Sequence, residues 1–142
     1  LPERARDVIK LNIDAEVAYE EGRCEEAVKL YREIADHLPK DTQSLLRIGN
    51  CHARGKNTPR AIDAYREAIQ RDPYFVKAWY NLSYLQAQDL GKTVAEMSMN
   101  TDPSDPSLAY ARRLSRAILA AFEAESANKK NKNPAQSEPV TQ

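Results

Sequence analysis

The sequence has no excess of either charge and no long apolar segment. Lysine and arginine total 21, aspartate and glutamate also total 21, and the formal net charge is zero. A neutral chain has no long-range field that would attract nucleic acid or an anionic membrane. The apolar run near the end, Ala117 to Phe122, is far shorter than the roughly 20 residues that cross a bilayer. We therefore expect no nucleic-acid partner and no membrane-spanning segment.

Cysteine and glycine are scarce, and catalytic groups do not cluster. The two cysteines, Cys24 and Cys51, fit neither a zinc motif nor a dense disulfide framework. We favour two small packed apolar side chains, with a disulfide between neighbouring units as the alternative. The four glycines form no phosphate-binding loop, and His37 and His52 have no carboxylate or cysteine at ligand spacing. The sequence thus predicts no enzyme activity, cofactor, metal site or small-molecule substrate.

A period of 34 residues is the strongest pattern that is present. Alanine recurs at positions 27, 61 and 95. Four more columns keep the spacing: small Ala15, Gly49 and Ser83; large Leu11, Leu45 and Trp79; then Tyr31, Tyr65 and Met99; and finally Pro39 and Pro73. A period of this length indicates a helical hairpin that buries its apolar face by stacking on copies of itself. The chain is therefore predicted to be an all-α solenoid.

Local signals divide the repeat region into six helices, paired as three hairpins. The first helix is expected to stop at Gly22, the third to be capped by Asp41 or Thr42, and the fourth to be capped by Thr58. Small residues are expected to let the helices of each hairpin approach closely. The pairs are Ala15 with Ala27, Gly49 with Ala61, and Ser83 with Ala95.

The end of the chain departs from the period. The sixth helix is expected to end near Asn100, and Asp105 and Pro106 should begin a seventh helix. Its apolar stripe comprises Leu108, Ala111, Leu114, Ile118 and Phe122, and it is predicted to cap the array. Residues 127–142 contain almost nothing to bury and are predicted to be a disordered tail. Residues 1–126 are predicted to form one domain.

The periodic columns resemble the tetratricopeptide repeat. The resemblance is carried by LNIDAEVAYEEGRCEEAVKLYREIADHLP, LLRIGNCHARGKNTPRAIDAYREAIQRDP and AWYNLSYLQAQDLGKTVAEMSM. It implies a right-handed α-solenoid of three hairpins, at about 8–41, 42–75 and 76–103, with the capping helix at about 106–126. It is a guide to fold more than to function, because the repeat is a scaffold for many binding surfaces.

The resemblance also implies that the first helix of each hairpin lines a concave groove that binds protein. The groove residues that we predict to contact a peptide or amphipathic helix are Asn12, Ile13, Glu16, Leu46, Arg47, Asn50, Lys77, Tyr80, Asn81 and Tyr84. The same register places Ile9, Tyr19, Glu20, Gln43, Arg54 and Gln88 on these faces. An ordinary helix surface without a ligand is the alternative. Of the positions that form the family's carboxylate clamp for chaperone peptides, only Lys77 matches, so that ligand is not expected.

Two roles for such a binding scaffold stay open. The AWYNLS phrase and the start at Leu1 are similar to small bacterial envelope lipoproteins that act as pilotins for secretins and tight-adherence pili. In that case the adaptor would associate with a membrane only through an N-terminal lipid anchor that this sequence no longer contains. It would act in the periplasm or at the outer membrane. The alternative is a cytoplasmic co-chaperone or secretion chaperone.

Overall fold

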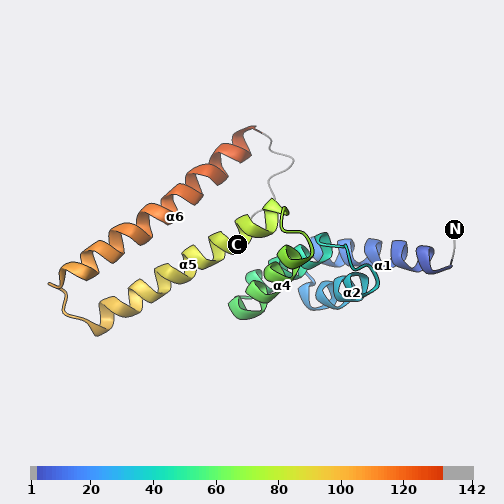
Figure 1. The fold of residues 1–142 in the computed structure, drawn as a ribbon, viewed down its shortest axis with the longest axis horizontal. Coiled ribbons are helices and arrows are strands. Elements are labelled where there is room, and N and C mark those ends of the chain that lie inside the picture. Colours follow the sequence, from blue (N-terminus) through green and yellow to red (C-terminus); the bar gives the residue numbers. More distant parts are fainter. Residues whose placement is uncertain (1–2, 133–142) are drawn as a thin grey trace. The chain divides into compact units, whose positions relative to one another are not determined.

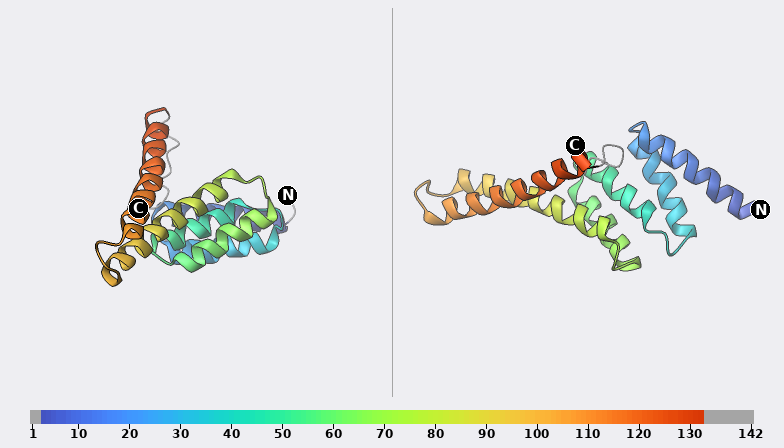
Figure 2. Two further views of the ribbon diagram at one scale, coloured as in Figure 1. Left: turned by 60° about the vertical axis from the view of Figure 1, so that its left-hand side comes forward. Right: turned by 90° about the horizontal axis from the view of Figure 1, so that it is seen from above.

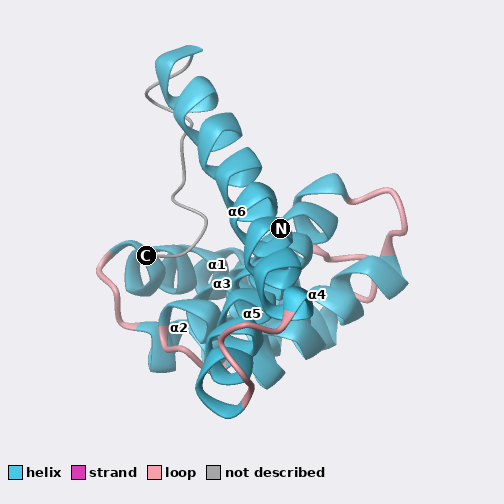
Figure 3. Cartoon of the chain, turned by 90° about the vertical axis from the view of Figure 1, so that its left-hand side faces the viewer, coloured by secondary structure: helices cyan, strands magenta, loops and turns pink. Residues whose placement is uncertain are grey.

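The computed structural model describes residues 3–132, which are helical throughout apart from short connections (Figure 1, Figure 3). No strand occurs within this range, so the predicted all-α class is confirmed. The helices are α1 (Glu3–Glu20), α2 (Cys24–His37), α3 (Gln43–Arg54), α4 (Thr58–Arg71), α5 (Val76–Asn100) and α6 (Pro106–Lys132). The chain divides into two compact units, and the boundary between them lies inside α5, between Leu82 and Ser83.

The first unit contains two helical hairpins, α1–α2 and α3–α4, followed by the beginning of α5. Figure 2 shows α1 and α2 joined by a tight turn. Gly22 makes this turn at φ 74°, a left-handed conformation that glycine adopts without strain. The Arg23 N–H then donates to the Ala18 carbonyl at 2.8 Å, and the Gly22 N–H donates to the Tyr19 carbonyl at 3.1 Å. The predicted stop of the first helix at Gly22 is therefore correct.

The second hairpin is bounded by side-chain caps, one of which differs from the prediction. The Asp41 carboxylate accepts from the Ser44 N–H at 3.2 Å and so caps the start of α3, as expected. Asn57, not Thr58, caps α4, because its side chain accepts from the Arg60 N–H at 3.4 Å. Thr58 is the first residue of the helix instead. A residue of either type can cap a helix, so the sequence alone did not choose between them.

Small residues and tyrosines share the core of the first unit. Ala15, Ala27, Gly49 and Ala61 are all buried, as predicted for the close faces of the hairpins. A Cβ atom on Gly49 would overlap the Tyr65 ring, so this position has room only for glycine. Tyr31 and Tyr65 are among the largest fully buried side chains, together with Leu45, Leu46 and Ile48.

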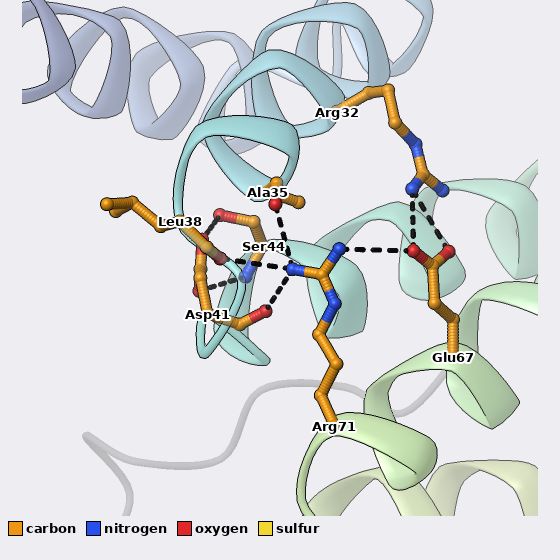
Figure 4. A network of polar contacts seen from close by, with 7 residues as sticks. All are labelled: Arg32, Ala35, Leu38, Asp41, Ser44, Glu67 and Arg71. Atoms are coloured by element: carbon orange, nitrogen blue, oxygen red, sulfur yellow. Dashed lines mark hydrogen bonds and ion pairs between the residues drawn. The ribbon is translucent and has the colours of Figure 1, made fainter.

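A guanidinium cluster fastens the second hairpin to the first (Figure 4). Arg71, in the last turn of α4, donates to three main-chain carbonyls at the end of α2 and in the following loop. These belong to Ala35 at 2.8 Å, Leu38 at 3.1 Å and Asp41 at 3.2 Å. Glu67 accepts from Arg71 at 3.3 Å and from Arg32 of α2 at 3.0 Å. A cation placed over free helix-end carbonyls satisfies groups that the helix itself leaves unpaired.

A disulfide also joins the two hairpins. Cys24, the first residue of α2, is bonded to Cys51 of α3, with Cα atoms 5.3 Å apart. Free, packed cysteines were the favoured prediction, and that preference was wrong, whereas the alternative of a disulfide between neighbouring units is confirmed. Their spacing of 27 residues shows no recognisable motif, so only the stacking of α3 against α2 reveals the pairing.

The second unit contains the rest of α5 and α6. The prediction of a break between a fifth and a sixth helix is wrong, because α5 continues through Gly91 to Asn100. Ser83 and Ala95 consequently lie on one helix, and Ala95 is exposed, so no third hairpin forms in the predicted way. The segment lacks proline, and one internal glycine costs only about 1 kcal/mol relative to alanine, which is too little to end a helix.

Helix α6 begins where the seventh helix was predicted to begin, but it ends later. Asp105 accepts from the Ser107 N–H at 2.8 Å, and Pro106 is the first helical residue. The helix continues to Lys132, so residues 127–132 of the predicted tail are helical, while residues 133–142 lie outside the described residues. Of the predicted stripe, Leu108 is buried, but Leu114 is 45% exposed. The role of α6 as a cap for the array stays a prediction.

Candidate functional site

A network of polar and aromatic side chains connects the first helices of successive hairpins in the first unit. We call it the polar–aromatic ladder, and it comprises Glu16, Tyr19, Arg47, Asn50, Arg54 and Asn81, with Tyr31 and Tyr65 contributed by the second helices. Each of its hydrogen bonds and ion pairs joins residues of different helices. The three first helices α1, α3 and α5 thus present one connected set of side chains.

Tyr19 is held between two arginines at the α1 end of the ladder. The guanidinium carbon of Arg47 lies 4.3 Å from the ring centroid, and that of Arg54 lies 4.2 Å from it. The phenol oxygen of Tyr19 accepts from Arg54 Nη2 at 2.8 Å and from Asn50 Nδ2 at 3.2 Å. Cation–π contacts and hydrogen bonds together fix the ring and both cations.

Glu16 balances this positive charge. Its carboxylate lies 3.4 Å from Arg47 Nε and accepts a hydrogen bond from the Tyr31 hydroxyl. Burial, followed by the hydrogen bond to Glu16, raises the pKa of Tyr31 far above its usual value. The phenol therefore stays a proton donor, and the carboxylate stays an acceptor.

Asn50 is the centre of the ladder. Its Oδ1 accepts from the Tyr65 hydroxyl at 2.8 Å and from Asn81 Nδ2 at 2.8 Å, while its Nδ2 donates to Tyr19. Burial raises the pKa of Tyr65 well above its usual value, so this phenol also stays protonated. An amide that donates and accepts at once links α1, α3, α4 and α5 through a single side chain.

The ten predicted groove residues fall into three groups in the structure. Asn12, Ile13 and Lys77 are exposed, and Glu16, Asn50, Tyr80 and Tyr84 are partly buried. Leu46, Arg47 and Asn81 are buried, with exposed fractions of 2%, 7% and 8%. Leu46 was predicted to contact a partner in the groove, but this side chain packs in the core of the first unit instead.

The structure brings together four of the predicted contact residues, Glu16 with Arg47 and Asn50 with Asn81. Of the two predicted tyrosines, Tyr80 belongs to the first unit and Tyr84 to the second. There the Tyr84 ring contacts Phe122 edge-on, with centroids 5.3 Å apart.

Tyr19 and Arg54 belong to the ladder but were not among the ten predicted contact residues. The repeat register did place both on the groove face. The signal that could have singled them out is one aromatic residue on a first helix together with two arginines, Arg47 and Arg54, on the next first helix. Tyr31 and Tyr65 were assigned to the core, which is correct for their rings, but their hydroxyl groups reach the ladder.

The second unit has a groove of its own, of about 580 Å³. It lies between α5 and α6 and includes Tyr84, Gly91 and Ser115. Both charge signs border it, with Lys92 and Arg116 opposed by Glu123. This mixture favours no single ligand chemistry.

The described part of the chain contains no metal-ligand cluster and no membrane-spanning helix. Within residues 3–132, no group of three or more His, Cys, Asp or Glu side chains is placed to hold a metal ion. Over the same residues, no helix combines the length and apolar character that a membrane span requires.

Comparison with known families agrees with the architecture of the first unit. Residues 15–74, which include the end of α1 and all of α2, α3 and α4, match the family model described as Tetratricopeptide repeat. No curated protein matches the chain closely enough to indicate a relative. Modules of this family are typically non-catalytic and generally mediate interactions between proteins. The match thus supports tetratricopeptide repeats over residues 15–74, and it fits a helical solenoid fold.

Proposed function

We propose that this chain is a protein-binding module whose binding surface is the face of the first unit formed by α1, α3 and the beginning of α5. The observation that supports the proposal is the polar–aromatic ladder. It holds donors and acceptors of three successive first helices in fixed positions. A surface whose side chains are ordered before binding loses less conformational entropy when a partner arrives.

The chemistry of this face suits a segment that carries carboxylate or carbonyl groups. Arg54 is partly exposed and already directed by its bond to Tyr19, and Lys77 is exposed on α5. Asn12 adds an exposed amide on α1. Cations and amides of this kind recognise the acceptor groups of an extended peptide or of a helix end. Tyr80 supplies adjacent aromatic area for an apolar anchor of the partner.

Site-specific photo-crosslinking tests this proposal in cells that produce the chain. A photoreactive residue replaces Asn12 or Lys77 on the proposed face, and Asp63, exposed on α4, serves as the matched control. We expect the same partner segment to be captured from positions 12 and 77 and not from 63. Capture of that segment from position 63 to the same extent would contradict the proposal.

The identified segment then permits a quantitative measurement. Lys77→Glu reverses an exposed charge on the proposed face, and Asp63→Lys reverses one away from it. We expect Lys77→Glu to raise the dissociation constant by about tenfold, since charge reversal replaces attraction by repulsion at a contact. Asp63→Lys should leave it within about twofold. Equal effects of the two reversals would show that the segment binds elsewhere.

The disulfide supports a narrower role in the bacterial envelope. Disulfides persist in oxidising compartments such as the periplasm and are rare in the cytosol. The Cys24–Cys51 bond therefore favours an envelope adaptor, such as a pilotin for a secretin or pilus system, over a cytoplasmic co-chaperone or secretion chaperone. Rapid acid quenching and thiol alkylation of producing cells tests this role. A protected, oxidised pair supports it, and two alkylated thiols would favour the cytoplasmic alternative.

A further inference from the structure

The outer side of α1 carries an exposed apolar stripe. Ile9, Ile13 and Val17 are 49%, 57% and 45% exposed. Their four-residue spacing places them on one side of the helix, one above another. The stripe is separate from the polar–aromatic ladder, and none of its residues takes part in that network.

The 34-residue period shows what covers the equivalent positions in the next repeat. Ile13 corresponds to Arg47, which is buried against Glu16 of α1. Val17 corresponds to Cys51, which is bonded to Cys24 of α2. In the second repeat, these positions of the first helix are therefore occupied by the preceding hairpin.

The third first helix repeats the arrangement. Asn81, one period beyond Arg47, is 8% exposed and donates to Asn50 of the hairpin before it. The same helix position is thus covered by a preceding hairpin at α3 and at α5. Its counterpart in α1, Ile13, is the exposed and apolar member of the series.

The second helices also contact the preceding hairpin, and they do so through charged groups. Glu67 and Arg71 of α4 reach back to the preceding hairpin, where they contact Arg32 and the carbonyls at the end of α2. One period earlier stand Glu33 and His37 of α2, both exposed. The edge formed by α1 and α2 is therefore equivalent to the surface through which the second hairpin stacks on the first. Glu33 stands on this edge where Glu67 stands on the second hairpin.

We propose that this edge of α1 and α2 is a docking surface for a helical hairpin of the same type, presented by a partner protein. The second helix of that hairpin carries a basic residue facing Glu33, as Arg32 faces Glu67, and packs against Val17. Its first helix packs against Ile13, as α1 packs against Arg47. The end carbonyls of that helix lie within reach of His37. The chain accepts the hairpin as one more layer of its stack.

A second copy of this chain fits the surface less well. The layer that stacks here presents a second helix, and the second helices of the first unit, α2 and α4, are each already followed by a first helix. The α2 helix is bonded to α3 through Cys24, and Tyr65 of α4 lies in hydrogen-bond contact with Asn81 of α5. A partner hairpin with a free second helix has no such obstacle.

The first experiment titrates the full chain with a synthetic peptide of residues 42–75, whose Arg66 stands one period after Arg32. We expect 1:1 binding, weakened at least tenfold by Ile13→Glu because a carboxylate replaces a buried apolar anchor. Val76→Glu changes a side chain that is 73% exposed on α5, and it should leave the affinity unchanged.

A charge exchange tests the register. Glu33→Arg should weaken binding about threefold, the size of one partly exposed ion pair, and Arg66→Glu in the peptide should restore it. Weakening without restoration would place Glu33 away from the contact and overturn the proposed register.

A second chain covers the case in which the isolated peptide does not fold. It carries an additional copy of residues 42–75 directly before residue 8, one period ahead of the first repeat. We expect its unfolding temperature to exceed that of the parent by several degrees, and Ile13→Glu to abolish the gain while leaving the parent unchanged.

Three outcomes would overturn the proposal. One is an extended chain no more stable than the parent. Another is an equal effect of Ile13→Glu on both chains. The third is a dimer of the parent chain in sedimentation that Ile13→Glu dissolves, since a second copy would then occupy the edge. None of these measurements tests partner binding to the face formed by α1, α3 and the beginning of α5. A negative result would therefore overturn the docking surface and leave the proposed function untouched.

Discussion

The two units of this chain are both helical, but their helices are joined differently. In the first unit, Tyr31, Tyr65, Leu45 and Ile48 are almost completely buried. In the described part of the second unit, Leu108 is the single large side chain buried to that degree. A helix in a stack packs on two sides, whereas each helix of a pair packs on one, so the stack buries larger side chains.

The connections differ as well. A disulfide, the Arg71 cluster and the Asn50 bonds all join different repeats in the first unit. In the second unit, the Tyr84 ring packs against Phe122, and Leu108 is buried. Regions with fewer buried contacts open at lower free energy. We therefore expect the second unit to exchange its amide hydrogens faster than the first.

Removing the disulfide should have the largest effect, and only on the first unit. A bond that closes a loop of this length, with 27 residues of separation, stabilises a fold by about 3 to 4 kcal/mol. The double change Cys24→Ala and Cys51→Ala should reduce the free energy of unfolding by that amount in urea titrations. Hydrogen exchange in α6 should stay unchanged. An equal acceleration in α6 would show that the two units unfold together.

The Arg71 cluster is the next largest contribution. The residue one period after Arg71 is Asp105, whose side chain caps α6. This position of the second unit therefore carries no equivalent of Arg71. Arg71→Met should cost about 2 kcal/mol, because it leaves carbonyls near the end of α2 without a charged donor. Arg66→Met, at an exposed position of the same helix, is the matched control and should change chemical unfolding by less than about 0.5 kcal/mol. Similar losses from both changes would mean that the contacts in Figure 4 contribute little.

Two glycines inside helices allow a direct comparison of packing. A Cβ on Gly49 would overlap the Tyr65 ring, whereas one on Gly91 would lie 3.4 Å from Leu119 Cδ1, an ordinary contact. Gly49→Ala should therefore destabilise by about 1 to 3 kcal/mol. Gly91→Ala should be neutral or stabilise by up to about 1 kcal/mol through helix propensity. Thermal unfolding of both variants checks the opposite signs, and destabilisation by Gly91→Ala would show that the second unit is packed as tightly as the first.

The smallest expected effect is a pH dependence confined to the first unit, which contains both histidines. Burial, together with the charges of Arg60 and Arg32, lowers the pKa of His52 below the ordinary value of a histidine. As the pH falls below about 6.5, the unfolded chain binds a proton before the folded chain does, so stability decreases. Urea unfolding between pH 7.5 and 5.5 should show this slope, and His52→Gln should reduce it. An unchanged slope in the variant would assign the effect to other groups.

Much of the first unit followed from the sequence because its signals are local or periodic. Gly22, Asp41 and the buried small residues act within one hairpin, and the period placed the first helices correctly. The predicted break in α5 was wrong. The 34-residue period continues in the sequence of this segment, but the segment contains no residue that ends a helix. The prediction for Leu46 was wrong because a groove position and a core position differ by only a small rotation of the helix.

The site was less predictable than the fold. The register brought Glu16, Arg47, Asn50 and Asn81 to one face, but not their bonds to Tyr19, Tyr31 and Tyr65. Those bonds depend on side-chain lengths and on the separation of neighbouring helices, which no single position encodes. The disulfide belongs to the same class, because it joins residues that only stacking brings together.

The Cys24–Cys51 bond also determines how the chain can respond to a pulling force. Tension that enters through the chain ends passes through the bond and bypasses the 27-residue segment that follows Cys24. At about 3.4 Å per extended residue, roughly 90 Å of chain is withheld from extension. The turn between the first two repeats, and the Arg71 acceptors within it, would therefore remain unextended in an adaptor that holds a partner under load.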